Sequence, residues 1–261
     1  MRGWRLDELL ARHGVPGAQV AVLAGGEIRD EAAGVLSRAT GVEVTTDAVF
    51  EVGSITKIWT ATLVQRLADA GRLDLDRPIR EHLPGFRLAD PVATATMTAR
   101  HLLTHTSGID GNHFIDTGRN DDAIERFVAT LAEAEHPLPP GTVLSYSNSG
   151  YAVLGRLVEV LYGRPFHDVL RDELIVPLGL RTAAVDTYQA ILRRAAVGHV
   201  GSEPVTDWAV SYYSAPSGSH FAISARELLQ FVRLHLTDPA LATLREPWVT
   251  AVPDFGGGVI G

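Results

Sequence analysis

One segment of the sequence has the pattern of a helix that is buried on nearly all sides. Residues 54–70 place large apolar side chains at helical intervals and stay apolar around the circumference until Gln65, and Gly71 follows as a helix stop. A helix that is apolar all round has to be enclosed by other elements. The chain therefore needs layers packed around residues 54–70, and its 261 residues are enough for one large domain.

The start of this predicted helix carries a serine and a lysine one turn apart. Lys57 follows Ser54 on the same side of the helix. A capping box would have Glu or Gln at position 57, and the helix dipole disfavours a cation in the first turn. Lys57 is the only lysine, since the other 22 of the 23 basic residues are arginine. Because a desolvated lysine can lose its proton and arginine cannot, the pattern favours a catalytic pair. A serine helix cap is the alternative.

A second candidate segment is Tyr146-Ser147-Asn148, which follows a proline-rich turn at residues 139–141. A serine nucleophile needs a base within hydrogen-bond reach, and a loop tyrosine can supply one if an ammonium stabilises its phenolate. Free lysine and tyrosine both have pKa values near ~10, so the pair needs burial and mutual charge to act at neutral pH. The amide of Asn148 can hold Lys57 and a substrate carbonyl. The alternative is a turn followed by an Asn helix cap, with Tyr146 half-buried.

The rest of the pattern begins with an amphipathic helix that contains Leu6, Leu9 and Leu10, followed by strands and then mostly by helices. Residues 18–23 and 27–34 flank Gly25-Gly26 and predict an antiparallel hairpin, and a strand at 48–52 leads into the buried helix. Further helices are predicted for residues 98–104, 121–134, 151–162, 166–175 and 225–236, the last opened by a capping box from Ser224 to Glu227.

The two motifs and several further stretches resemble one family. Ser54-Ile55-Thr56-Lys57 followed by Tyr146-Ser147-Asn148 is similar to the serine β-lactamase and penicillin-binding protein superfamily. The resemblance is to the class C β-lactamase-related branch, which includes D-alanyl-D-alanine carboxypeptidases and family VIII carboxylesterases. Other matching stretches lie at residues 17–22, 50–54, 101–108, 146–155, 177–180 and, loosely, 215–228.

The resemblance implies an α+β fold, a three-layer α/β/α sandwich with an antiparallel sheet and a helical insertion lobe. We expect a single β-lactamase-related domain over residues 1–261. Its sheet hairpin and nucleophile helix would lie in residues 1–72 and a mostly helical lobe in residues 73–222. A helix and the start of a returning strand would occupy residues 223–261.

The resemblance also implies roles for the candidate residues. Ser54 would be the acylated nucleophile, Lys57 and Tyr146 the proton-transfer pair, and Asn148 the substrate-positioning residue. The expected activity is a serine hydrolase that forms an acyl-enzyme with a β-lactam, a D-Ala-D-Ala peptide or a small ester. The alternative is a catalytically impaired or truncated member that binds a ligand or a partner. No metal or organic cofactor is implied.

One departure from the family concerns its third motif, which is Lys or His, then a small residue or Thr, then Gly. His199-Val200-Gly201 imitates it but directly follows residues 177–196, where the family has a Gly-aromatic loop. The sequence stops after residues 255–260, which would begin a returning strand. We therefore expect a C-terminally incomplete fold whose site is open on one side and keeps only the Ser54 N–H as an oxyanion donor.

Composition argues against several other classes of protein. The net charge of −8 disfavours nucleic acid as a partner. The absence of cysteine excludes a thiol nucleophile and zinc–thiolate sites. No apolar run is long enough to cross a membrane and no signal peptide is visible, so cytoplasmic location is the default expectation. A missing leader would make the protein periplasmic or secreted. The expected partner is a small-molecule or peptide substrate, and the oligomeric state is open.

Two histidines have the spacing of a metal-binding pair. His101 and His105 are four residues apart, but no acidic third ligand accompanies them. We favour the alternative of a loop-ordering histidine before Ser107-Gly108, which also fits the family.

Overall fold

The structure is a computed structural model that describes residues 4–135, 138–207, 211–246, 252–253 and 259–260. The chain forms two compact units, and each unit is built from separated stretches of sequence. We call them the strand unit and the helical unit. The strand unit consists of Met1–Val52, Leu174–Val210 and His220–Asp238, and the helical unit of Gly53–Glu173, Ser211–Ser219 and Pro239–Gly261.

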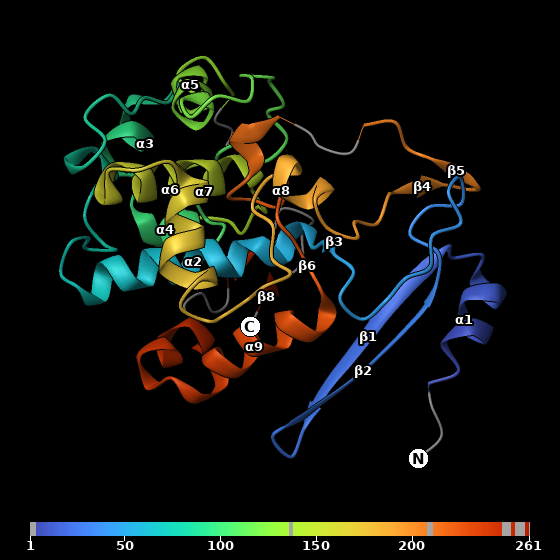
Figure 1. Cartoon of the computed structure of the whole chain (residues 1–261). Helices are drawn as coiled ribbons and strands as arrows, with labels where there is room; N and C mark the ends of the chain where they lie inside the picture. The colour runs from blue at the N-terminus through green and yellow to red at the C-terminus, as the bar shows by residue number, and fades with distance from the viewer. Residues whose placement is uncertain (1–3, 136–137, 208–210, 247–251, 254–258, 261) are drawn as a thin grey trace. The chain divides into compact units, whose positions relative to one another are not determined.

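The strand unit is built on a long antiparallel hairpin (Figure 1). β1 (Gly17–Ala24) pairs with β2 (Glu27–Gly34) in continuous register, from Gly17 opposite Gly34 to Ala24 opposite Glu27. Gly25 and Gly26 both have positive φ and form the two-residue turn. The predicted hairpin is therefore confirmed. α1 (Leu6–His13) packs against β2.

A second strand pair connects distant parts of the strand unit. β3 (Phe50–Glu51) pairs antiparallel with β6 (Ala222–Ile223), and the Val52 N–H donates to the Phe221 carbonyl at 3.1 Å. The predicted strand at residues 48–52 is thus present but short. Buried Leu36, Val44 and Ala48 pack with Ala32, Phe50 and Ala196.

α9 (Ala225–Thr237) packs against β1 within the same unit. Ser224 caps this helix as predicted, because its Oγ accepts the Glu227 N–H. The other contact of the predicted capping box, from the Glu227 side chain back to the Ser224 N–H, is absent. The Glu227 carboxylate instead accepts the N–H groups of Arg181 and Thr182 at 3.0 and 2.8 Å and the Thr182 hydroxyl at 2.7 Å. The turn at residues 181–182 offers the carboxylate several donors at once, whereas a capping box offers it one.

The remaining elements of the strand unit are short. α8 spans Thr187–Ile191, and β4 (His199–Val200) pairs with β5 (Glu203–Pro204). The sequence that imitates the third motif lies on β4, where His199 Nε2 accepts the Arg38 N–H at 3.1 Å.

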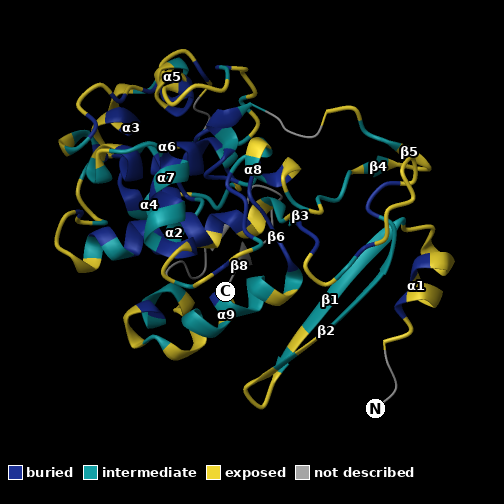
Figure 2. Cartoon of the chain, viewed as in Figure 1, coloured by how far each residue is buried: buried dark blue, intermediate teal, exposed yellow. Residues whose placement is uncertain are grey.

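The helical unit has α2 (Thr56–Asp69) and α6 (Asn148–Tyr162) packed together at its centre (Figure 1). Figure 2 shows both helices as mostly buried. The sequence predicted that this helix is buried on nearly all sides. That prediction is wrong at its beginning, where Ile55 at the cap position and Ile58 in the first turn are 43% and 50% exposed. These two residues lie three apart on one face, so the exposed stripe is confined to the end of the helix beside Ser54. The enclosed residues of α2 include Trp59, Leu63, Val64 and Leu67.

Shorter helices and turns surround this pair, and several match the predicted segments. α4 and α7 both contact α6, as does α5. A π-helical turn, Arg171–Ile175, continues α7 to the end predicted for that helix. The short helices are α3 (Pro91–Thr96), α4 (Ala99–Leu103), α5 (Ala123–Thr130) and α7 (Phe166–Leu170).

The end of the chain is described only in part. β7 (Val252–Pro253) pairs with β8 (Val259–Ile260). The predicted returning strand at residues 255–260 lies outside the described residues except for its last two. Across the part of the chain that is described, no helix combines the length and the apolarity needed to span a membrane.

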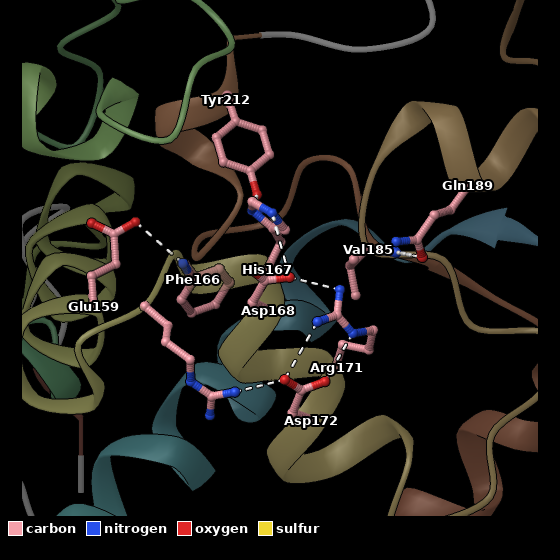
Figure 3. Close-up of polar contacts among 10 residues, drawn as sticks. Glu159, Phe166, His167, Asp168, Arg171, Asp172, Val185, Gln189 and Tyr212 are labelled. Carbon is pink, nitrogen blue, oxygen red and sulfur yellow. Dashed lines mark hydrogen bonds and ion pairs between the residues drawn. The ribbon is translucent and has the colours of Figure 1, made fainter.

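A buried carboxylate joins α6 to α7. Glu159 Oε1 accepts the Phe166 N–H at 3.2 Å, and Figure 3 shows the side chain pointing at the start of α7. Arg156 bonds the other oxygen at 3.1 Å and also pairs with Glu125. Burial raises the pKa of Glu159 to about 7, against the opposing effects of Arg156 and the Phe166 N–H.

This carboxyl predicts a pH-dependent stability. The folded state keeps a proton on Glu159 where the unfolded chain has lost it, so stability falls as pH rises from about 4.5 to about 7. Glu159→Gln keeps an acceptor for Phe166 and does not titrate. The loss of unfolding free energy between about pH 5 and about pH 8 should shrink by on the order of 1–3 kcal/mol. Denaturant unfolding across this range measures it, with Glu133→Gln, at an exposed position, as the control. An unchanged pH dependence in Glu159→Gln would contradict it.

Candidate active site

Ser54 lies on an exposed turn at the beginning of α2. A 3₁₀ turn, Gly53–Ile55, precedes the helix, and Ile55 occupies the cap position. The alternative of Ser54 as a helix cap is therefore wrong. Gly218 lies against this turn with φ +147°, and a Cβ on it would come within 2.8 Å of the Gly53 carbonyl carbon and 3.0 Å of the Ser54 nitrogen. The serine turn thus fits closely against a residue that has to be glycine.

Lys57 points its ammonium into the helical unit and is only 5% exposed. Its Nζ lies 3.1 Å from Ser54 Oγ and 2.7 Å from Asn148 Oδ1, and it also donates to the Ser217 carbonyl oxygen. Burial lowers the pKa of Lys57, while the hydrogen bond and charge of Tyr146 act to raise it. The net direction is down, so this amine is easier to deprotonate than a free lysine.

The Tyr146 hydroxyl is directed at Ser54. Its oxygen is 2.7 Å from Ser54 Oγ, and Lys57 Nζ sits 4.7 Å from the centre of the Tyr146 ring. Tyr146 is 51% exposed, which agrees with the half-buried side chain of the turn-and-cap alternative, but its hydroxyl is directed at Ser54. Because hydroxyl hydrogens rotate, the contact between the two oxygens lets a proton pass in either direction.

Asn148 is the first residue of α6 rather than its cap. Ser147 occupies the cap position, where its Oγ accepts the Gly150 N–H at 3.0 Å. The Asn-cap alternative is therefore wrong, and the Asn148 side chain is available to bond Lys57 through Oδ1. The structure thus brings together all four residues that the sequence singles out, Ser54, Lys57, Tyr146 and Asn148.

The Ser217 carbonyl is a part of this site that the sequence did not reveal. The stretch Ser211–Ser219 returns to the helical unit. Besides Ser217, it places the Pro216 carbonyl 2.7 Å from Thr60 Oγ1. Residues 215–218 matched the family pattern loosely, but a backbone carbonyl leaves no signal in the residue type.

The same stretch is anchored at its other end by Tyr212. The Tyr212 hydroxyl bonds His167 Nδ1 on α7, and Figure 3 shows the two side chains pointing toward each other. The Tyr212 N–H also donates to the Gly118 carbonyl at 3.3 Å. Two residues that precede Ser217, Tyr212 and Pro216, are therefore anchored by hydrogen bonds within the helical unit.

The two histidines of the i, i+4 pair bond separate backbone amides. His101 Nδ1 accepts the Thr98 N–H at 3.3 Å, and His105 Nδ1 accepts the Ser147 N–H at 3.1 Å. His105 thus orders the loop before α6, so its side chain does have a loop-ordering role, but on residues 145–147 rather than on the loop at Ser107-Gly108. In the described ranges of the chain, no three His, Cys, Asp or Glu side chains are placed to hold a metal ion together.

The chain is similar in sequence to several known proteins. The family model described as Beta-lactamase matches residues 5–259. The chain is 46% identical to penicillin-binding protein 4 of Amycolatopsis lactamdurans over 90% of this chain and 63% of that protein. It is 33% identical to the esterase EstB of Burkholderia gladioli over 67% of this chain and 48% of that protein. The chain therefore spans less than two thirds of the length of either relative.

A solved structure with a similar fold is a class C β-lactamase from Rhodobacter sphaeroides. The TM-score is 0.74 at 26% identity, over 91% of this chain and 67% of that one.

The single lysine makes the charge state of the site measurable. Protein labelled with ¹³C at lysine Cε should give one lysine resonance, because Lys57 is the only lysine in the chain. Its titration midpoint should lie below the ordinary value of 10.5, because burial lowers the pKa. Tyr146→Phe should lower the midpoint further, because the tyrosine hydroxyl raises it. A midpoint that rises in Tyr146→Phe would contradict the described contact.

Proposed function

We propose that this chain, which belongs to the beta-lactamase family, forms a covalent acyl-enzyme at Ser54 and acts as a serine hydrolase. The fold expected for this family, of the α+β class, is confirmed by the structural similarity. The observation that carries the proposal is the position of Ser54 Oγ, 3.1 Å from Lys57 Nζ and 2.7 Å from the Tyr146 hydroxyl. A serine hydroxyl is a weak nucleophile unless such a base stands beside it.

In this proposal Lys57 and Tyr146 act as one proton-transfer pair. The Ser54 Oγ proton passes to the pair while Oγ bonds to the carbonyl carbon of an amide or ester. The pair then gives the proton to the leaving nitrogen or oxygen as its bond to carbon breaks. Water then attacks the acyl carbon and gives a proton to the pair. The bond from carbon to Ser54 Oγ breaks, Oγ takes the proton back, and the carboxylic acid is released. Lys57 Nζ lies 4.7 Å from the centre of the Tyr146 ring, so the two groups are close enough to act together.

Asn148 is proposed to orient both the base and the substrate. Its Oδ1 faces Lys57 at 2.7 Å, so its Nδ2 is directed elsewhere and can donate to a substrate carbonyl. The Ser54 N–H is proposed as an oxyanion donor, since the nucleophile stands on the 3₁₀ turn that opens α2.

The relatives support a carbonyl substrate and leave its class to experiment. One is named a penicillin-binding protein, one an esterase, and the structural neighbour a class C β-lactamase. We propose a β-lactam, a D-Ala-D-Ala peptide or a small ester as substrate. The penicillin-binding relative is the more similar of the two, which favours the first two classes.

A reactivity test decides whether Ser54 is the nucleophile. A fluorescent penicillin and a fluorophosphonate should each add one acyl or phosphonyl group to the wild type, because Ser54 Oγ is exposed and flanked by its base. Intact mass spectrometry measures the adduct. Ser54→Ala should show none, and label retained in that variant would refute the assignment. Saturable binding without any adduct would instead favour an inactive ligand-binding protein.

A second prediction concerns the proton carried by Lys57. Lys57→Arg keeps a cation but removes the ability to become neutral. Acylation should slow by about 10²–10⁴-fold, the usual contribution of a positioned acid–base group. Arg66→Lys on the same helix serves as the control. Stopped-flow labelling gives the rates and circular dichroism confirms folding. A folded Lys57→Arg variant with the wild-type rate would show that Lys57 has no proton role.

A further inference from the structure

His105, which is not one of the four candidate residues, contacts each of residues 145–147. The His105 carbonyl accepts the Ser145 N–H at 2.8 Å, and its ring Nδ1 accepts the Ser147 N–H at 3.1 Å. Between these two contacts the imidazole stacks on the Tyr146 ring, with 4.4 Å between ring centres and an angle of 30°. His105 therefore contacts three consecutive residues, the middle one through the ring whose hydroxyl reaches Ser54.

The backbone of His105 adopts a conformation that costs energy. It follows α4 with φ +57°. The Thr106 N–H bonds the His101 carbonyl at 2.9 Å and the His105 N–H bonds the Leu102 carbonyl at 3.4 Å, which is a Schellman motif. Glycine is the usual residue at this left-handed position, and other residues pay of order 1–3 kcal/mol there. A histidine at this place indicates that its side chain is needed.

The imidazole is held in its neutral form as an acceptor. Burial, and secondarily the charge of Lys57, lower the pKa of His105 to about 4. Because Nδ1 accepts the Ser147 N–H, the single ring proton lies on Nε2. The groups that face this ring are Lys57, Tyr146 and Tyr151, the last with its ring centre 5.1 Å away.

We propose that His105 is a positioning residue that holds the Tyr146 hydroxyl on Ser54. This inference rests on the proposed function for its effect on rate. Tyr146 is half exposed, so few other side chains can restrain its ring, and the hydroxyl must stay 2.7 Å from Ser54 Oγ to exchange a proton. The stacked imidazole restrains the ring, and the Ser147 and Ser145 bonds restrain the backbone on either side of it.

Two variants separate the ring from the backbone strain. His105→Gly removes the ring and relieves the left-handed backbone, and His105→Asn keeps a short acceptor that tolerates this conformation. Both should slow labelling of Ser54 by about 10²-fold, the cost of a misplacement near 1 Å, while half-saturating probe concentrations change by less than about twofold. His101→Asn, which removes the neighbouring ring four residues earlier, should label at the wild-type rate. If His105→Asn is folded and labels at the wild-type rate, the proposal is overturned.

The lysine resonance tests the same proposal without catalysis. If His105 holds Tyr146 against Lys57, His105→Gly should lower the Lys57 titration midpoint, as Tyr146→Phe does. Adding His105→Gly to Tyr146→Phe should then lower it no further. Water entering the vacated space would instead raise the midpoint, and an unchanged or raised value overturns the proposal. This readout still applies if the wild type takes no acyl label, a result that would refute the proposed function alone.

Discussion

The site depends on the burial of one ammonium among oxygen acceptors. Lys57 is almost fully enclosed, and a buried charge is costly unless its N–H groups are bonded. The oxygens of Ser54, Asn148 and Ser217 supply three bonds. All three acceptors are neutral, so they satisfy the N–H groups without cancelling the positive charge. An amine in this setting is well ordered and yet comparatively ready to lose a proton, which is the combination that general base catalysis needs.

Separate stretches of the chain each deliver one part of this arrangement, and each has its own support. The serine turn rests against Gly218, and the tyrosine segment rests on His105. The Ser217 carbonyl is positioned by hydrogen bonds of nearby residues in the same stretch. Thr60 bonds the Pro216 carbonyl, and His167 bonds the Tyr212 hydroxyl. The supports are backbone hydrogen bonds, ring stacking and close glycine contacts. They are local and specific, so the oxygen and nitrogen atoms of the site stay within hydrogen-bond distance although most of them come from different elements.

The features predicted from sequence are those that a residue type or a period encodes. The hairpin turn at Gly25-Gly26 and the helix ending at Tyr162 follow from glycine and from apolar spacing. The site pairing of Ser54 with Tyr146, 92 residues apart, came from motif resemblance rather than from any local signal. The Ser217 carbonyl could not be foreseen, because every residue has one. Full burial of the first turn of α2 was a wrong prediction, since apolar spacing does not distinguish a packed face from one that borders an open site.

The place of Ser217 in the sequence has a consequence for biosynthesis. Its carbonyl bonds a lysine 160 residues earlier in the chain. A protein is made from its N-terminus, so Lys57 and Asn148 leave the ribosome well before residue 217. Until then the ammonium lacks one of its acceptors, and water has to take that place. The lysine can therefore acquire its final degree of dehydration only after residue 217 has been made, and its lowered basicity depends on a segment far from it in the sequence.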